Sequence, residues 1–187
     1  MKKSLLLSLT FLAIAASAFA QVKVATVDMA KLFDGYTKAK AAEASIQGDI
    51  EKLGSEAQRR QTEGRDLVQQ LQDLQTKAGN AALSQAARDS AKKQAVALED
   101  KLEARRIEFE KFQSTSRENL AEKESTQRIK IYGEIQAAAT AVARRHGATV
   151  VLNVSEKTAA GLPAVVYSDK NYDITSEVLA TLNAGTK

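Results

Sequence analysis

The side chains of this chain that could do chemistry are mostly charges, and they do not stand in the patterns that catalysis requires. His146 is the one histidine, and it directly precedes Gly147. We expect it at the C-terminal end of a helix, where it interacts with the helix dipole. The sequence has no cysteine, no phosphate-cradling glycine loop with lysine, no metal-ligand spacing and no nucleophile elbow. We therefore predict that the protein is not an enzyme and needs neither a metal nor a cofactor.

Basic side chains collect between residues 59 and 93, where seven of them face four acidic ones, a local net charge of +3. Such a bias could attract acidic partners or anionic lipid surfaces at a distance, an effect that salt weakens. Each single charge also fits an ordinary solvated helix face, so only the collective bias supports the hypothesis. The basic residues are Arg59, Arg60, Arg65, Lys77, Arg88, Lys92 and Lys93.

The N-terminus has the pattern of a secretory signal. Lysines at positions 2 and 3 precede an apolar stretch at 5–16, and small residues at 18 and 20 form a cleavage site, so we expect residues 1–20 to be removed. No later segment approaches the roughly 20 apolar residues that a membrane helix needs. We predict an exported, soluble protein. Without the two signal lysines, the 27 basic and 23 acidic residues leave a net charge of +2.

Nucleic-acid binding is suggested by the pI of about 9.2, but other features argue against it. The charge after cleavage is close to neutral, and aromatic residues, which would stack on bases, make up 5% of the chain. The export signal also removes the protein from the cytoplasm. We expect no specific nucleic-acid partner.

Two long helices should position the charges. Nothing except isolated glycines interrupts a helix over about 29–77 or over about 81–145. Between these ranges stands Ala78-Gly79-Asn80, in which Gly and Asn accept the left-handed conformation that ends a helix. The two helices should therefore fold back on each other as a hairpin with its tip near Gly79.

Apolar residues in both helices follow the four-three spacing of a coiled-coil seam, from Ile46 to Leu74 in the first and from Leu83 to Leu120 in the second. An antiparallel alignment about Gly79 places Leu71 opposite Ala87 and Ile46 opposite Phe112. Leu67, Leu71, Leu74 and Leu83 fit this seam, and they could contact a partner only if they are partly exposed.

Three glycines inside the first helix need an explanation, because each costs about 1 kcal/mol relative to alanine. Close helix packing is one explanation, strongest for Gly64, which the alignment places opposite Ala95. A softer arm is the other, and for Gly48 and Gly54 the two explanations stand equal.

The chain on either side of the hairpin should form a small base. Residues 22–27, 149–154 and 164–167 are typical of strands, and a short amphipathic helix follows Asp173. About 70 residues make a marginal core on their own. We therefore predict an oligomer in which copies of Val24, Val150, Leu152 and Val165 build a shared sheet core.

The two ends of the mature chain carry a family resemblance. The strand at 22–27 followed by Asp28-Met29-Ala30-Lys31-Leu32-Phe33, and the closing stretch from Tyr172 to Asn183, resemble the Skp/OmpH family of periplasmic chaperones. The resemblance covers the mature chain and implies a homotrimer with a β-rich body and three helical tentacles around a cavity. Such a protein is a holdase that takes up unfolded outer-membrane proteins without ATP and prevents their aggregation before membrane insertion. The family's proposed lipopolysaccharide-binding basic cluster is assigned to no residue here.

These arguments combine into one expectation. The fold is α+β and mostly α, with a long antiparallel helical hairpin at 33–129 on a trimerisation body made of 21–32 and 130–187. A structural coiled-coil protein of the envelope without chaperone activity is the alternative. The client-binding candidates are the seven basic residues of 59–93 together with Leu67, Leu71, Leu74 and Leu83.

Overall fold

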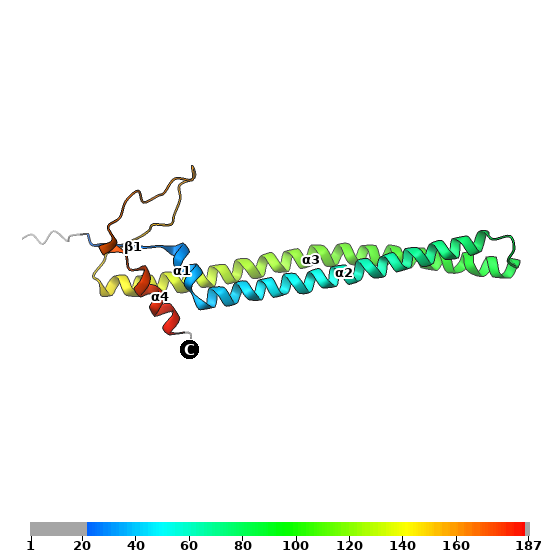
Figure 1. Cartoon of the computed structure of the whole chain (residues 1–187), viewed down its shortest axis with the longest axis horizontal. Coiled ribbons are helices and arrows are strands. Elements are labelled where there is room, and N and C mark those ends of the chain that lie inside the picture. The colour runs from blue at the N-terminus through cyan, green and yellow to red at the C-terminus, as the bar shows by residue number, and fades with distance from the viewer. Residues whose placement is uncertain (1–21, 186–187) are drawn as a thin grey trace, which may run out of the picture.

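A computed structural model describes residues 22–185, so the signal expected at residues 1–20 lies outside the described residues. Figure 1 shows two long helices side by side, with every other element gathered at one end. We call residues 37–129 the arm and the rest of the described chain the body. The elements in chain order are β1 (Val24–Val27), α1 (Met29–Gly35), α2 (Thr37–Gly79), α3 (Gln85–Arg145), β2 (Val150–Asn153), the 3-10 turn η1 (Lys170–Tyr172) and α4 (Thr175–Ala184).

The first helix was predicted to be continuous, but it breaks at Tyr36, which has extended backbone and is almost fully buried. The side chain of Asn183 in α4 bridges the break. Its Oδ1 accepts from the Thr37 backbone N–H at 3.0 Å, and its Nδ2 donates to the Gly35 carbonyl at 3.1 Å. A helix end leaves backbone groups unpaired, and here a residue far away in sequence satisfies them. The break therefore depends on tertiary structure.

The hairpin is confirmed, but its turn is built differently from the prediction. Gly79 is the last residue of α2, and Asn80 has φ −77° rather than a left-handed conformation. Its Oδ1 accepts from the Ala82 backbone N–H at 3.0 Å. Ser84 caps α3, its Oγ accepting from the Ala87 N–H at 3.3 Å. Because serine is a strong N-cap, the second helix starts at Gln85 rather than near residue 81.

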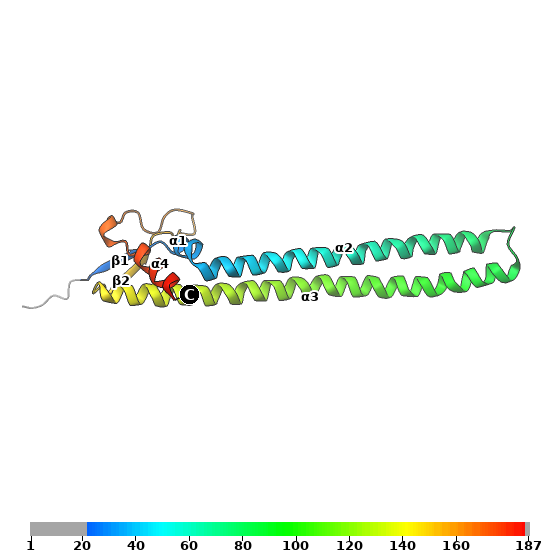
Figure 2. The ribbon, with the colours of Figure 1, turned by 60° about the horizontal axis from the view of Figure 1, so that its bottom comes forward.

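The pairing of α2 with α3 differs from the predicted register by fourteen residues. Phe112 lies beneath the guanidinium of Arg60, 4.6 Å from its ring centre, and not opposite Ile46. Asp49 pairs with Lys123 in the same register. Fourteen residues are two heptads, so the same seam residues face each other in new pairs. Figure 2 shows the two helices running together along the arm.

The sheet of the body has two parallel strands, β1 and β2, with Val24 beside Val150 and Val27 beside Asn153. The predicted strand at 164–167 is wrong. These residues form bends in a loop that projects from the body in Figure 1, and Val166 is 94% exposed. On its other side β1 meets the chain only at an isolated bridge between Thr26 and Asp173. Within the described chain, residues 164–167 pair with neither β1 nor β2; the Ala164 N–H instead donates to the Glu156 carbonyl at 2.9 Å, next to an isolated bridge between Lys157 and Pro163.

The core of the body lies where α3 meets α1, α4 and β1. Its fully buried large side chains are Leu32, Ile135, Val142 and Val178. α3 ends where the sequence predicts: Gly147 has φ +67°, and the Ala148 N–H donates to the Ala143 carbonyl at 2.9 Å. This is the hydrogen bond of a Schellman motif. It turns the chain back so that β2 can reach β1.

Candidate binding surfaces on the arm and the body

The arm has little buried apolar surface. Beyond Ala39 at its base, its buried side chains are Leu67, Ala91 and Ala95. Larger apolar side chains stay in water, among them Val68, 44% exposed, and Ile107, 54% exposed. Among the helices of residues 22–185, none has a segment long and apolar enough to cross a membrane. The arm is therefore a rod with partly open apolar surface.

A groove of about 780 Å³ lies between α2 and α3 in the middle of the arm. We call it the mid-arm groove. Its apolar floor is formed by Gly64, Val68, Leu102 and Phe109. Its charged rim carries Arg60, Arg65, Arg105 and Arg106 together with Glu99 and Glu103.

Gly64 explains why the groove is open. A Cβ built on this residue would meet no atom within 4 Å, and the same holds for Gly48 and Gly54. Close packing of Gly64 against Ala95 was therefore a wrong prediction, because the observed register places Gly64 beside Arg105 and Phe109. The packing explanation fails for all three glycines. A softer arm stays a prediction for Gly48 and Gly54.

The predicted basic residues separate into paired and unpaired side chains. Arg59 bonds to Glu56 at 2.7 Å and to Glu63 at 2.6 Å, and Arg60 bonds to Glu56 at 2.7 Å. These hydrogen bonds, Arg59 first, lower the pKa of the Glu56 carboxyl. Lys92 lies 3.9 Å from Asp89. Within the described residues, the candidates that form no ion pair are Arg65, Lys77, Arg88 and Lys93.

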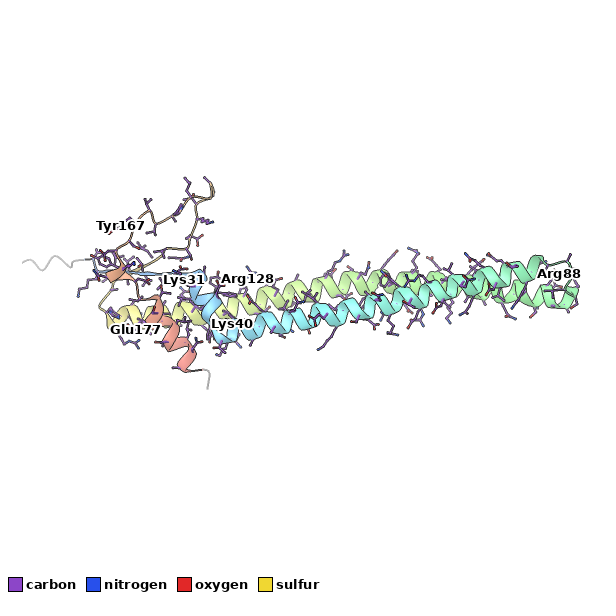
Figure 3. All side chains as sticks on the ribbon, viewed as in Figure 1. Lys31, Lys40, Arg88, Arg128, Tyr167 and Glu177 are labelled. Carbon is purple, nitrogen blue, oxygen red and sulfur yellow. The ribbon has the colours of Figure 1, made fainter. Side chains whose placement is uncertain are left out.

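We call residues 59–93 the outer arm. Its cations without ion pairs account for much of its positive net charge. Arg88, labelled near the far end of the arm in Figure 3, donates to the uncharged Gln85 amide oxygen at 2.6 Å. Arg65 donates to the Thr62 hydroxyl at 3.1 Å. Both guanidinium groups keep hydrogen-bond capacity for an external carboxylate or phosphate, because each has five N–H donors.

Three of the four candidate leucines, Leu67, Leu71 and Leu74, lie on α2, and Leu83 lies in the turn before α3. Leu67 is buried, whereas Leu71, Leu74 and Leu83 are half-buried. Partial exposure is what a contact to a partner requires, so the last three keep that possibility. Their role in binding stays a prediction.

Of the predicted candidates, Arg60 and Arg65 line the mid-arm groove. The sequence interpretation missed Val68, Leu102, Arg105, Arg106 and Phe109 as members of one site. Val68 gave a signal, because it is an apolar residue outside the four-three spacing and one helical turn from Gly64. An apolar residue off the seam beside a seam glycine indicates an open groove.

A polar cluster that the sequence did not reveal joins the arm to the body. The Tyr36 hydroxyl donates to the Glu134 carboxylate, and Lys38 Nζ lies 3.1 Å from the same oxygen. The hydrogen bond from Tyr36, followed by that from Lys38, lowers the pKa of Glu134. Burial, and then the Glu134 bond, raises the pKa of Tyr36. The cluster holds the start of α2 against α3.

The predicted oligomerisation residues lie at an open surface of the body. Val150 and Leu152 on β2 are each 40% exposed, and Val24 and Val165 are half-buried. Val24, Leu152 and Val165 line a cavity of about 600 Å³ together with Tyr167, which Figure 3 places on the projecting loop. Thus three of the four residues share a cavity, and Val150 lies outside it.

His146 ends α3 as expected, and its partner is a carboxylate that the sequence interpretation missed. Its Nε2 lies 2.6 Å from Glu177 of α4, and Arg145 reaches the same carboxylate at 2.9 Å. These hydrogen bonds, His146 first, lower the pKa of Glu177. In residues 22–185, no group of three or more His, Asp or Glu side chains could hold a metal ion. His146 therefore ties α4 to α3.

Known proteins share this architecture. Residues 23–182 match the family described as outer membrane protein (OmpH-like). Chaperone protein Skp of Photorhabdus luminescens is 29% identical over 181 residues, which cover 96% of this chain and 98% of that protein. The protein of the same name from Photorhabdus laumondii subsp. laumondii has the same identity and coverage. A crystal structure from Caulobacter crescentus CB15, described as a putative outer membrane chaperone (OmpH-like), shares the fold with a TM-score of 0.68 at 18% identity, covering 88% of this chain and 85% of that one.

Proposed function

Because this chain belongs to the OmpH-like outer membrane protein family, as its sequence predicted, we propose that it is a periplasmic chaperone. It holds unfolded outer-membrane proteins without ATP and prevents their aggregation before membrane insertion. The names of the Photorhabdus relatives support a chaperone role. The observation that carries the proposal is the slender arm with its partly open apolar surface, standing off a compact body.

The arm suits a protein that holds chains without folding them. An unfolded membrane β-barrel exposes apolar strands whose edges pair with neighbouring chains. Weak contacts scattered over a long surface cover such strands without fixing one structure. Exposed Val68, Val96 and Ile107 provide apolar contacts of this kind among charged side chains. Leu71, Leu74 and Leu83 add half-buried ones.

The unpaired cations of the outer arm attract the client. Arg65, Lys77, Arg88 and Lys93 form no ion pair among the described residues, so their charge is not cancelled locally. A set of like charges speeds the association of an oppositely charged chain, and salt weakens the effect. Arg59, Arg60 and Lys92 belong to the same candidate surface but have carboxylates beside them.

The body assembles three copies so that the arms enclose a cavity. A two-stranded sheet is marginally stable alone, and an open strand edge pairs readily with another chain. β2 pairs with β1 on one side, while Val150 and Leu152 remain exposed. The body, residues 22–36 and 130–185 of the described chain, supplies the shared hub, and the arm projects from it. The apolar loop around Val166 is also available to cover a neighbouring copy.

Mass determination of the full mature chain, with and without an unfolded porin, tests the assembly and the cargo together. We expect the mass of three chains alone and a stable complex with porin. Stoichiometric amounts should suppress porin aggregation in the absence of nucleotide. A folded monomer at micromolar concentration would contradict the assembly. A trimer that leaves porin aggregation unchanged would instead identify a structural coiled-coil protein.

The charge contribution has a separate test. Lys77, Arg88 and Lys93, all without ion pairs, are replaced together by Gln. The matched control replaces Lys31, Arg128 and Arg145, which are in ion pairs outside the outer arm, and changes the net charge equally. We expect slower porin capture and a weaker salt dependence in the first variant only. Equal behaviour of both variants would remove the electrostatic part of the proposal.

A further inference from the structure

We infer that the mid-arm groove is a docking site for an extended segment of unfolded polypeptide in which a large apolar side chain lies close to a carboxylate. The inference rests on the proposed function and names the class of segment that the arm selects. The observations are an open apolar floor, and a rim on which one arginine, Arg65, has no carboxylate partner among residues 22–185.

The floor of the groove has the size and composition of a ligand site. Its volume of about 780 Å³ falls within the roughly 300–1,000 Å³ typical of small-molecule pockets, so it holds more than one side chain. Val68 and Phe109 line it from opposite helices, and Gly64 between them contributes no side chain. A glycine in a helix interior is unfavourable, and no close packing compensates for it here. The cost leaves an open apolar floor in the middle of the arm.

The rim of the groove supplies a positive charge that complements a carboxylate on the bound segment. Three of its four arginines have carboxylates of this chain beside them: Arg105 bonds to Glu108 at 2.7 Å, Arg106 to Glu103 at 2.6 Å, and Arg60 to Glu56. Arg65 bonds only to the Thr62 hydroxyl among the described residues. Its planar guanidinium is suited to a carboxylate in two-point contact. Arg65 and Val68 are neighbours on one helix face, so a segment could place a carboxylate and an apolar side chain on them together.

The opposite wall favours a polypeptide over a phosphate-bearing lipid. Glu99 and Glu103 line that wall; Arg106 neutralises Glu103, whereas Glu99 forms no ion pair among the described residues and repels a phosphate group. In the part of the chain that the structure describes, Glu99 accepts one long hydrogen bond, of 3.4 Å from Gln75, so its carboxylate can also accept from backbone N–H groups. An extended chain carries such donors at every residue, and it spaces its side chains by about 3.3 Å per residue along the groove. A wall with both signs of charge therefore matches a peptide.

Labelled peptides of defined sequence test the inference on the full assembled chain. The first peptide alternates Phe and Glu among Ser and Gly, the second has Gln in place of Glu, and the third has Ser in place of Phe. Fluorescence anisotropy measures their binding. We expect the first to bind best, the second several-fold more weakly and the third not measurably.

Two substitutions, each with a matched control, locate the binding. Gly64→Leu fills the floor, and Gly48→Leu is its control because Gly48 is another half-buried glycine of α2 with open space around its Cβ position. We expect Gly64→Leu to weaken binding of the first peptide at least about tenfold. Gly64→Ala, which favours the helix, should weaken it less. Circular dichroism confirms that each variant is folded.

The rim is tested by Arg65→Gln, with Arg128→Gln near the base of the arm as the control. Arg65→Gln should abolish the difference between the Glu and Gln peptides, and Arg65→Lys should restore part of it. Equal binding of the first peptide to the Gly64→Leu and Gly48→Leu variants would contradict the docking site. A preference for the Glu peptide that persists in Arg65→Gln would contradict it as well. Arg65-dependent binding of anionic vesicles without binding of peptides would also overturn it.

The same experiment separates this inference from the proposed function. Suppression of porin aggregation is measured on every variant alongside peptide binding. If the wild-type chain suppresses porin aggregation but binds no peptide, the proposed function stands and the groove is not a docking site. If the wild-type chain leaves porin aggregation unchanged, the proposed function is contradicted. Peptide binding then tests the docking site by itself.

Discussion

The body and the arm are held together in opposite ways. In the body, Leu32, Ile135, Val142 and Val178 are fully buried among elements that come from both ends of the chain. In the arm, much of the bonding is local, as in the ion pairs of Arg59 and Arg106 with residues three or four positions away. A region that must keep one shape buries its apolar side chains. A region that must adapt to other chains leaves them partly exposed.

Removing a core leucine should have the largest effect and should separate the two regions. We expect Leu32→Ala to lower the free energy of unfolding by about 2–5 kcal/mol, because it leaves a cavity among fully buried side chains. Leu67→Ala in the arm should cost less, since its neighbourhood is open and can relax. Urea titrations followed by circular dichroism measure both. Equal losses would mean that the arm is packed as tightly as the body.

The junction between the regions should respond to the loss of one side chain. Asn183→Ala removes the acceptor for the Thr37 N–H and the donor to the Gly35 carbonyl. We expect a loss of about 1–2 kcal/mol, comparable to deleting a helix cap. Hydrogen exchange should quicken at the start of α2 and stay unchanged near Leu67. Faster exchange along the whole of α2 would show that the arm depends on this junction throughout its length.

Alanine at glycine positions should change stability with opposite sign in the two regions. Gly48→Ala should stabilise the arm by about 1 kcal/mol, because its Cβ meets open space and alanine favours the helix. Gly35→Ala should destabilise the body, because its Cβ would lie 2.7 Å from Leu179 Cδ2. Thermal unfolding of both variants tests this contrast. A stabilised Gly35→Ala variant would show that Leu179 moves aside without cost.

Acid should weaken the junction between the arm and the body, which is one of several places where folding lowers the pKa of a carboxyl group. The folded chain lowers the pKa of Glu134 from its usual 4.5, so the charged form stabilises the fold. That contribution is present above pH 4.5 and is lost as the pH falls through the lowered value. Glu134→Gln should therefore reduce the loss of stability below pH 4.5, measured by urea titration at several pH values.

The sequence predicted the hairpin, the family and the end of α3, because these features follow from local patterns. The register could not be predicted, since a seam that repeats every seven residues fits equally well after a shift of two heptads. The break at Tyr36 depends on Asn183, far away in sequence. The strand expected at 164–167 has β propensity, but its first residue bonds back to Glu156 and the segment does not reach β1 or β2. The groove depends on the register, so it could not be predicted either.

The parallel pairing of β1 with β2 makes the arm a crossover connection. Val24 and Val150 are adjacent in the sheet although the whole arm separates them in sequence. Closing so long a loop from an unfolded chain costs entropy and slows folding. If α2 pairs with α3 from the tip, the two strands come within reach of each other before they pair. A paired arm thus shortens the loop that the two strands have to close.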